Sequence, residues 1–348
     1  MVRPRSGKLD RLLQHVPLRL ARACTPRTVF PLFYHVVSSE TLPHIEHLYD
    51  YKSPEQFERD LAFLKQRFHV ATYEELVAHQ NGTKRLPSGS VTLTFDDGLA
   101  ECHSIVRPLL VKYGLPCTFF VCANFMDNRS MMFRNAVSLC LSALEALSDE
   151  QVRTAAGELQ RSLGVQLEGR EALASWVHGL TYGERAHVTE VCSALGVDIP
   201  AYLATVRPYM TSEQILDLHR DGFTIGAHTC DHPELWRLDW PDVVREIVDS
   251  CQVVRDLTGR DEVPFAIPFN GARLDRDALA ELQRTTEGLG LIFDTNNLRI
   301  ERDFLVNRVW CDSPVGAAPG ASNVPHVMRR AHTLEPLRAA RRLLRRGS

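Results

Sequence analysis

The sequence from Val91 to Gly98 reads VTLTFDDG and guides the interpretation of the whole chain. Apolar residues alternate with two threonines along it, and this period of two predicts a strand that ends at Asp96, Asp97 and Gly98. Two adjacent carboxylates repel each other, and a cation bound by one of them relieves that repulsion. The alternative is an ordinary polar turn, since Asp and Gly are common turn residues.

The segments on either side of this strand predict a parallel sheet. Residues after Gly98 have a helical pattern to about Tyr113, and an apolar strand follows at Cys117–Ala123. Strand, helix and strand at this spacing form a βαβ unit, in which the two strands run parallel. Further predicted strands are Val29–His35, Phe223–Ala227, Pro264–Phe269, Gly290–Asp294 and Leu305–Trp310.

Polar residues stand at or just beyond the carboxyl ends of these strands. In a barrel of parallel strands all such ends meet at one mouth, so we expect these side chains to share a site. Arg308 differs because it lies within its strand. The residues at strand ends are His35, Asp96, Asp97, His228, His232, Asn270 and Asp294.

Residues 127–208 interrupt the alternation of predicted strands and helices. Three helical patterns follow one another there, and two of them begin with capping boxes, Ser148 with Gln151 and Thr181 with Glu184. We interpret the stretch as a helical insertion in a barrel loop that shapes or covers the site.

The segment HTCDHP, residues 228–233, supplies the second part of the chemistry. His228 and His232 are four residues apart, and on a helical turn this spacing points both imidazoles at a single ion. Two histidines and one carboxylate leave part of a metal's coordination sphere open to water and substrate, as hydrolysis requires. The pattern therefore predicts a metal site that joins HTCDHP to TFDDG.

Composition limits the class of protein. With 348 residues, 44% hydrophobic and 24% charged, the chain is typical of a globular protein with one large α/β domain or two smaller ones. Its nine cysteines are odd in number and include no C-x-x-C pair, which favours free thiols in a reducing compartment. Neither a long apolar span nor a signal peptide is evident, so we expect a cytoplasmic protein.

Both ends of the chain are basic. Residues 1–28 hold seven basic side chains against one acidic, and residues 326–348 hold seven arginines against one glutamate. Apolar residues recur at helical spacing in both segments. This pattern suits peripheral contact with an anionic membrane, but the preferred interpretation is that these helices pack an apolar stripe on the body of the protein. The acidic middle has no basic patch interleaved with aromatic residues, so we expect no nucleic-acid partner.

TFDDG followed by HTxxHP resembles the paired motifs of the polysaccharide deacetylase family, also known as the NodB-homology domain or carbohydrate esterase family 4. The resemblance covers about residues 29–312. It implies a distorted (β/α) barrel of about seven parallel strands, a divalent metal and removal of acyl groups from amino sugars. We expect a basic N-terminal segment at 1–28, the barrel at 29–325 with its insertion at about 127–208, and a basic C-terminal helix at 326–348.

The resemblance also implies roles for individual residues. Asp97, His228 and His232 would hold the metal, and Asp96 would be the general base. Zn²⁺ is the expected ion, with Co²⁺, Ni²⁺ and Fe²⁺ as alternatives.

The third family motif is similar to FAIPFNG at residues 265–271, although Ala266 stands where many members have an arginine. This departure, together with Tyr34 and His35, resembles the subgroup that deacetylates poly-N-acetylglucosamine. The substrate contacts implied by the resemblance are Pro268, Phe269, Asn270 and Arg308.

The last family motif, a leucine-rich strand with a histidine acid, is not evident. His326 and His332 lie in a basic stretch without a strand pattern. His35 ends a strand at the same mouth, so it is our preferred candidate for the acid or for a pocket residue.

We therefore expect a metal-dependent N-deacetylase of an amino-sugar saccharide or glycoconjugate, nucleotide-linked or lipid-linked, in surface polysaccharide biosynthesis. The alternatives are a catalytically inactive carbohydrate-binding barrel and a deformylase or amidase of a lipid-linked amino sugar. A non-hydrolytic iron oxygenase also uses two histidines and one carboxylate, but it leaves TFDDG unexplained.

Overall fold

The structure is a computed structural model that describes residues 16–23, 29–314 and 320–346, with the side chains of 337–346 left outside the description. The basic segment predicted at 1–28 lies mostly outside the described residues. Its described part includes the short helix α2, Leu18–Ala23.

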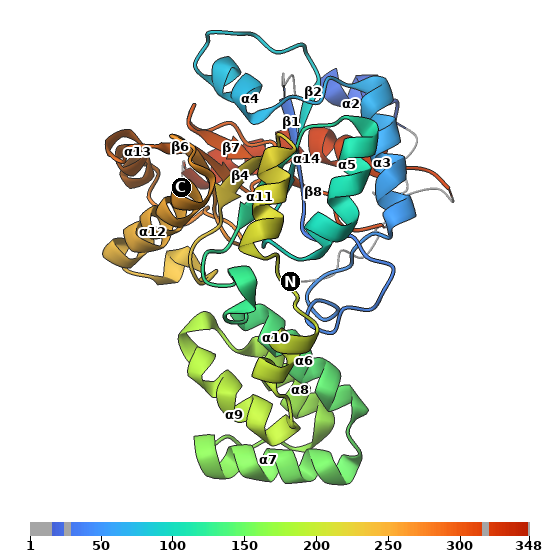
Figure 1. Ribbon diagram of the computed structural model, residues 1–348, viewed down its shortest axis with the longest axis vertical. Coiled ribbons are helices and arrows are strands. Elements are labelled where there is room, and N and C mark those ends of the chain that lie inside the picture. The colour runs from blue at the N-terminus through green and yellow to red at the C-terminus, as the bar shows by residue number, and fades with distance from the viewer. Residues whose placement is uncertain (1–15, 24–28, 315–319, 347–348) are drawn as a thin grey trace.

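Parallel strands form the centre of the molecule (Figure 1). They lie in the order β7-β6-β5-β4-β3-β2-β1-β8, and every neighbouring pair is parallel. The strands are β1 Val29–Tyr34, β2 Ser90–Phe95, β3 Thr118–Val121, β4 Thr224–Ala227, β5 Val263–Ala266, β6 Leu289–Asp294, β7 Leu305–Asn307 and β8 Val309–Trp310.

The last two strands nearly close the sheet into a barrel. β7 and β8 are consecutive in the chain and are separated only by Arg308. β7 pairs with β6 and β8 pairs with β1, so this one stretch joins both edges of the sheet. The predicted distorted (β/α) barrel is confirmed. It has eight strands, one more than predicted, because the stretch Leu305–Trp310 is divided at Arg308.

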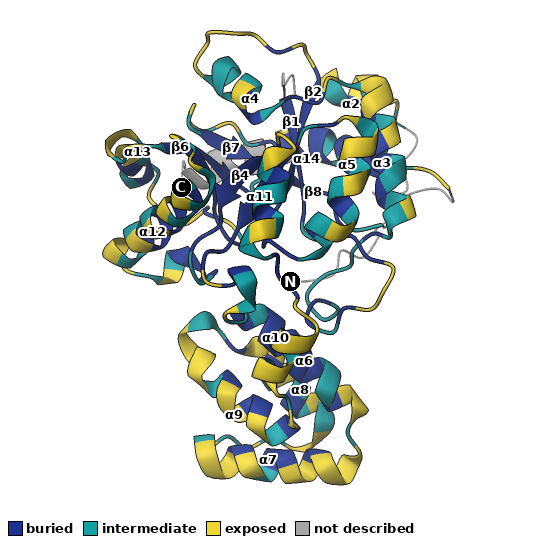
Figure 2. Ribbon diagram, in the orientation of Figure 1, coloured by how far each residue is buried: buried dark blue, intermediate teal, exposed yellow. Residues whose placement is uncertain are grey.

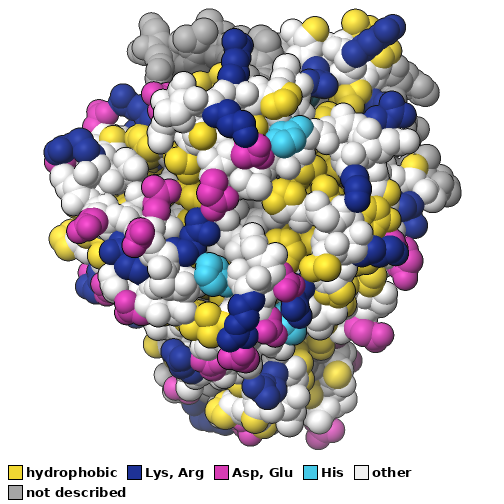
Figure 3. All heavy atoms as spheres, turned by 45° about the horizontal axis from the view of Figure 1, so that its top comes forward, with side chains coloured by type: hydrophobic (Ala, Val, Ile, Leu, Met, Phe, Trp, Pro, Cys, Tyr) yellow, Lys and Arg dark blue, Asp and Glu magenta, His cyan; other side chains and the backbone are white. Residues whose placement is uncertain are grey.

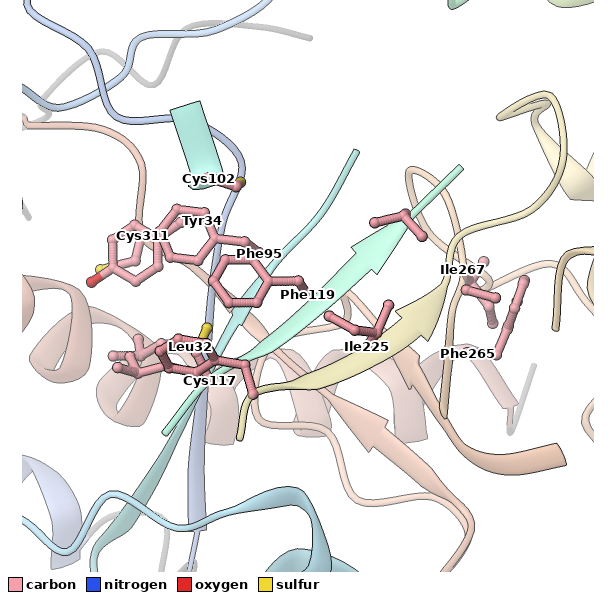
Figure 4. Close-up of a cluster of buried hydrophobic side chains, with 14 of the residues drawn as sticks. Leu32, Tyr34, Phe95, Cys102, Cys117, Phe119, Ile225, Phe265, Ile267 and Cys311 are labelled. Carbon is pink, nitrogen blue, oxygen red and sulfur yellow. The ribbon is translucent and has the colours of Figure 1, made fainter. Parts of the chain in front are cut away.

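Side chains alternate between the two faces of the barrel wall, as the period of a strand requires. On the outer face Leu32, Phe95, Phe119 and Ile225 belong to a large apolar cluster shared with the surrounding helices (Figure 4). The inner face is tightly filled. A Cβ added at Gly226 would lie 2.5 Å from the ring of Phe120, so only glycine fits there.

Helices surround the barrel and bury their apolar sides against it (Figure 2). Three of them begin with complete capping boxes, Ser53 with Gln56, Thr72 with Glu75 and Thr211 with Gln214, which explains where they start. The helices that surround the barrel are α3 Pro54–Arg67, α4 Tyr73–Gln80, α5 Arg107–Tyr113, α11 Ser212–Arg220, α12 Trp240–Thr258, α13 Arg276–Thr285 and α14 Val324–Arg346.

A group of helices between β3 and α11 forms a separate body at the lower end of Figure 1. It has its own apolar core, and its outer surface is exposed (Figure 2). Both capping boxes predicted from the sequence, at Ser148 and Thr181, are present. We call this group the helical insertion. It comprises α6 Phe133–Ala146, α7 Asp149–Leu163, α8 Gly169–Gly179, α9 Arg185–Leu195 and α10 Ile199–Thr205.

The C-terminal helix α14 packs against α2 and β8. Within the described part of the chain, no helix has the length and apolar character needed to span a membrane. The eight described cysteines are all free thiols. On the face drawn in Figure 3, basic and acidic side chains are interspersed rather than gathered into one patch.

Candidate active site

A cavity of about 830 Å³ lies at the mouth of the barrel, where the carboxyl ends of the strands meet. Two of the residues predicted to contact substrate, Pro268 and Arg308, do not line it, and neither does Asp294. The structure brings seven of the predicted residues together around the cavity, namely His35, Asp96, Asp97, His228, His232, Phe269 and Asn270.

Asp97, His228 and His232 converge on one point. The Oδ1 atom of Asp97 lies 3.4 Å from the Nε2 atom of each histidine, and all three side chains are buried. This oxygen is shielded from water and accepts no hydrogen bond. Tetrahedral coordination with bonds of about 2.0–2.1 Å separates ligand atoms by about 3.4 Å. The three side chains therefore fit a divalent cation in both donor type and spacing.

Neighbouring groups prepare the two imidazoles for this role. The Nδ1–H of His228 donates to the carbonyl oxygen of Ala266 at 2.8 Å, which leaves Nε2 free as a metal ligand. Burial lowers the pKa of His232 to about 3, so its ring is neutral. For Asp97, burial opposes ionisation, but the imidazoles of His228 and His232 hold its pKa well below the usual range.

The backbone around these ligands is strained. Asp97, Thr229, His232 and Phe269 all have positive φ, between 52° and 73°, although none is glycine. Such conformations cost of order 1–3 kcal/mol each and cluster at functional sites. The predicted helical turn at 228–232 is wrong, because Thr229 and His232 are left-handed. A hydrogen bond of 2.9 Å from the His232 N–H to Thr229 Oγ1 instead folds the loop.

Asp96 faces the cavity from beside Asp97 but has a different partner. Two guanidinium nitrogens of Arg308 donate to its two carboxylate oxygens, at 2.6 and 2.7 Å. Burial raises the pKa of Asp96, but the charge of Arg308 outweighs burial and lowers it overall. Asp96 is therefore an ionised carboxylate held in a fixed orientation.

Arg308 is fully buried inside the barrel, where its guanidinium lies 4.7 Å from the centre of the Phe33 ring and 5.2 Å from that of Phe120. The Nη1 atom, which donates to Asp96 Oδ1, also donates to Thr94 Oγ1 at 2.8 Å. The structure therefore places Arg308 behind Asp96, away from the cavity. It orients the carboxylate and is not positioned for the substrate contact that the resemblance implied.

His35 is held by a carboxylate that sequence reasoning missed. Its backbone N–H donates to Asp312 Oδ1 at 2.8 Å, and its ring Nδ1 lies 2.5 Å from Asp312 Oδ2. Burial by itself lowers the pKa of His35, but Asp312 more than offsets this and raises it to about 9. The ring is therefore protonated at neutral pH and faces the cavity. Neither His326 nor His332 lines the cavity; the His332 ring packs on Phe30, near the start of β1.

The other residues that line the cavity were not predicted individually, although the helical insertion was expected to shape or cover the site. Tyr49 and Trp310 lie beside His35, and their ring centres are 4.7 and 5.5 Å from that of the imidazole. The helical insertion contributes Met132, Arg134, Val137 and His178. One sequence signal pointed to the contribution of the insertion to this wall, namely its position directly after β3. β3 is the neighbour of β2, the strand that ends in the TFDDG motif.

Comparisons with solved structures find deacetylases that cover most of this chain. The Streptococcus pyogenes deacetylase PplD in complex with acetate is 18% identical, with 83% of this chain and 94% of that chain covered and a TM-score of 0.49. IcaB from Ammonifex degensii is 19% identical, with 88% and 97% covered and a TM-score of 0.49. The BpsB deacetylase domain from Bordetella bronchiseptica is 14% identical, with 81% and 95% covered and a TM-score of 0.45.

Curated protein sequences gave no match. The family model for polysaccharide deacetylase matches residues 83–156 and 183–286, slightly more than half of the chain. These two ranges contain both TFDDG and HTCDHP and omit part of the helical insertion. The chain belongs to the polysaccharide deacetylase family and is a hydrolase that acts on carbon–nitrogen bonds of carbohydrates.

Proposed function

We propose that this protein is a metal-dependent N-deacylase that removes an acetyl or related acyl group from an amino sugar. The observation that carries the proposal is the convergence of three chemical groups on one cavity. A set of cation ligands, an ionised carboxylate and a protonated imidazole all face it. An inactive carbohydrate-binding barrel would need none of these groups.

Asp97, His228 and His232 would hold the divalent cation. Their two imidazoles and one carboxylate suit Zn²⁺ best, and Co²⁺, Ni²⁺ and Fe²⁺ accept the same donors. When bound, such a cation lowers the pKa of a coordinated water and polarises an acyl carbonyl.

Asp96 acts as the general base. Its carboxylate takes the proton of the attacking water as the oxygen of that water bonds to the acyl carbon. Arg308 keeps the carboxylate ionised and fixes its direction through two parallel hydrogen bonds. The second lone pair of each carboxylate oxygen is left for the water proton.

His35 acts as the general acid. Asp312 holds its ring and favours its protonated form, so the imidazolium can donate a proton to the sugar nitrogen as the carbon–nitrogen bond breaks. The products are a carboxylic acid and a free amine. Asp312 serves to orient His35 and to favour its protonated form.

The sugar would rest on the aromatic and amide groups around the catalytic centre. Trp310, Tyr49 and Phe269 offer apolar ring surface, and Asn270 offers a hydrogen-bonding amide. Phe269 and Asn270 are the two predicted substrate-contact residues that do line the cavity.

The test is amine release by the purified protein after loading with Zn²⁺, Co²⁺, Ni²⁺ or Fe²⁺ in turn. N-acetyl and N-formyl amino sugars, free and as nucleotide or lipid conjugates, form the substrate panel. We expect metal-dependent amine release that falls about 100- to 10,000-fold in Asp96→Asn. Release of amine without added metal after chelation, or equal rates for wild type and Asp96→Asn, would contradict the mechanism. Preference for the N-formyl compounds would make the enzyme a deformylase.

We further propose that the substrate is a nucleotide-linked or lipid-linked precursor of a surface polysaccharide, met at the cytoplasmic face of a membrane. The basic segments 1–28 and 326–348 support this. Flotation with vesicles of anionic lipid, using the full chain and a chain without these segments, tests it. Unchanged flotation after truncation would contradict membrane contact.

A further inference from the structure

Glu246 is a buried carboxylate that the proposed mechanism does not use. It belongs to α12, and 8% of its surface is exposed. Its Oε2 atom accepts a hydrogen bond from the backbone N–H of Cys230 at 2.8 Å and another from that of Asp231 at 3.2 Å. These two donors lie in the HTCDHP loop, residues 228–233, between the two proposed histidine ligands. Glu246 therefore binds this loop through its backbone.

The HTCDHP loop has a conformation that needs support. Thr229 and His232, on either side of the two donors, have φ of 67° and 52°. A left-handed residue other than glycine costs of order 1–3 kcal/mol and persists where the surrounding structure holds it. The hydrogen bond from the His232 N–H to Thr229 Oγ1 joins residues of the loop only to each other. Contacts with other elements must therefore hold the loop in place.

Two elements hold the backbone of the loop. The N–H groups of Ala123 and Asn124, just after β3, donate to carbonyl oxygens of the loop at 3.1 and 3.2 Å. The carboxylate of Glu246 accepts from two of its N–H groups. Without this carboxylate the two N–H groups lose their acceptor, and the loop can relax toward a conformation in which water accepts these bonds.

Such a relaxation would act on the cation site. The Nε2 atoms of His228 and His232 both lie 3.4 Å from Asp97 Oδ1. The ring of His228 has a support of its own, the hydrogen bond from Nδ1 to Ala266. Nδ1 of His232 is buried and has no hydrogen-bond partner among the described residues. The position of the His232 ring therefore depends more strongly on the backbone of the loop.

We infer that Glu246 is a positioning residue, whose carboxylate holds the HTCDHP loop in the conformation that brings His232 to the cation. Glu246 does not line the cavity, so it acts through the loop and not on the substrate. The inference rests on the proposed metal-dependent function and adds a residue from α12 to its site.

The test measures metal binding by the full chain after removal of bound metal. Zn²⁺ affinity is obtained by competition with a chelator, and the visible absorption spectrum of bound Co²⁺ reports the coordination geometry. Binding that Asp97→Ala abolishes is assigned to the proposed site. Glu246→Leu removes the acceptor and keeps a side chain of similar size. We expect it to weaken Zn²⁺ binding about 10- to 100-fold and to change the Co²⁺ spectrum.

Two conservative variants separate the hydrogen bonds from the charge. Both N–H groups donate to one oxygen, so the amide oxygen of Glu246→Gln can accept both. We expect this variant to bind Zn²⁺ within about threefold of wild type. Glu246→Asp keeps the charge but draws the carboxylate back by one methylene, so it should bind Zn²⁺ more weakly than Glu246→Gln. This pair decides the question if Glu246→Leu does not fold.

Val254→Ala is the matched control for a loss of stability. Val254 is fully buried in the apolar core and lies about two turns further along α12. Thermal unfolding should show that this variant is destabilised, while its Zn²⁺ affinity and Co²⁺ spectrum remain those of wild type. Equal weakening of Zn²⁺ binding in Val254→Ala and Glu246→Leu would overturn the positioning role, because general destabilisation would then explain both.

The outcomes separate this inference from the proposed function. Wild-type affinity and an unchanged spectrum in Glu246→Leu, or Zn²⁺ binding by Glu246→Gln no tighter than by Glu246→Asp, would overturn the role of Glu246 while the deacylase function stands. Weakened binding in Glu246→Leu that Glu246→Gln restores, without amine release by wild type, would support this role and contradict the deacylase function. Absence of Zn²⁺ binding by wild type would overturn both.

Discussion

The two sides of the cavity differ in how they are built. The barrel side carries buried charged groups on strained backbone, with positive φ at Asp97, His232 and Phe269. The insertion side presents Val137 and Arg134 from α6, a regular helix. Strain and buried charge are costly and persist where chemistry needs fixed geometry. The difference indicates that the groups suited to the proposed reaction come from the barrel, whereas the insertion completes the wall of the cavity.

The largest effect is expected at the proposed cation ligands on the barrel side. Asp97→Ala or His228→Ala removes one of three donors, so bound metal should be lost. Lewis-acid stabilisation is worth several kcal/mol, which corresponds to a fall in kcat/KM of about 1,000-fold or more. Metal analysis of the purified variants, with amine release in parallel, checks this. His69→Ala, at a half-exposed surface histidine, is the control and should keep its metal.

Asp96→Asn is next in size. The variant keeps the shape of the side chain but cannot accept the water proton, so we expect kcat to fall about 100- to 10,000-fold with the metal content unchanged. It also leaves Arg308 buried without its counter-charge, which destabilises the fold by about 3–5 kcal/mol. Kinetics and thermal unfolding should be measured on one preparation. A folded, metal-loaded variant within a few-fold of the wild-type rate would remove Asp96 from the mechanism.

The acid assignment predicts a particular pH dependence. His35 must be protonated to act, so the wild-type rate should fall as pH rises through about 9. Asp312→Asn removes the carboxylate and leaves burial, which lowers the pKa of His35. The fall should therefore move to lower pH, with a loss of about ten- to a hundredfold at neutral pH. An unmoved alkaline limb in the pH–rate profile would show that another group is the acid.

The smallest effect is expected on the insertion side. Val137→Ala enlarges the cavity without touching the catalytic groups, so KM should change about two- to tenfold while kcat stays within about twofold. Val152→Ala lies in the core of the same insertion but does not line the cavity. It should lose comparable stability and keep the wild-type KM. A large fall in kcat for Val137→Ala would contradict the separation of roles.

Local patterns in the sequence predicted much of this molecule. Alternation in VTLTF predicted a strand at the centre of the barrel, and the capping boxes at Ser148 and Thr181 marked where helices begin. These signals succeed because each depends on residues within one turn or one strand. The barrel itself and the roles given to Asp96 and Asp97 came from the family resemblance.

Contacts between distant parts of the chain could not be predicted in this way. Asp312 pairs with His35 across 277 residues, and no local pattern marks it as a partner. Arg308 pairs with Asp96, which lies 212 residues away in the sequence. Arg308 was predicted to contact substrate, but it orients the Asp96 carboxylate instead. The segment His228–His232 does not form the predicted helical turn because two of its residues are left-handed. Neither of them is glycine, so the sequence does not indicate this conformation.

The closing stretch of the barrel has a consequence for how the enzyme becomes active during synthesis. Asp96, Asp97 and both histidines of HTCDHP are translated before residue 235. Arg308, which pairs with Asp96, and Asp312, which pairs with His35, come much later in the chain. A nascent chain that lacks this stretch has an open barrel edge and an incomplete centre. The pairs of Asp96 with Arg308 and of His35 with Asp312 therefore depend on β7 and β8, which pair with β6 and β1 at the two edges of the sheet.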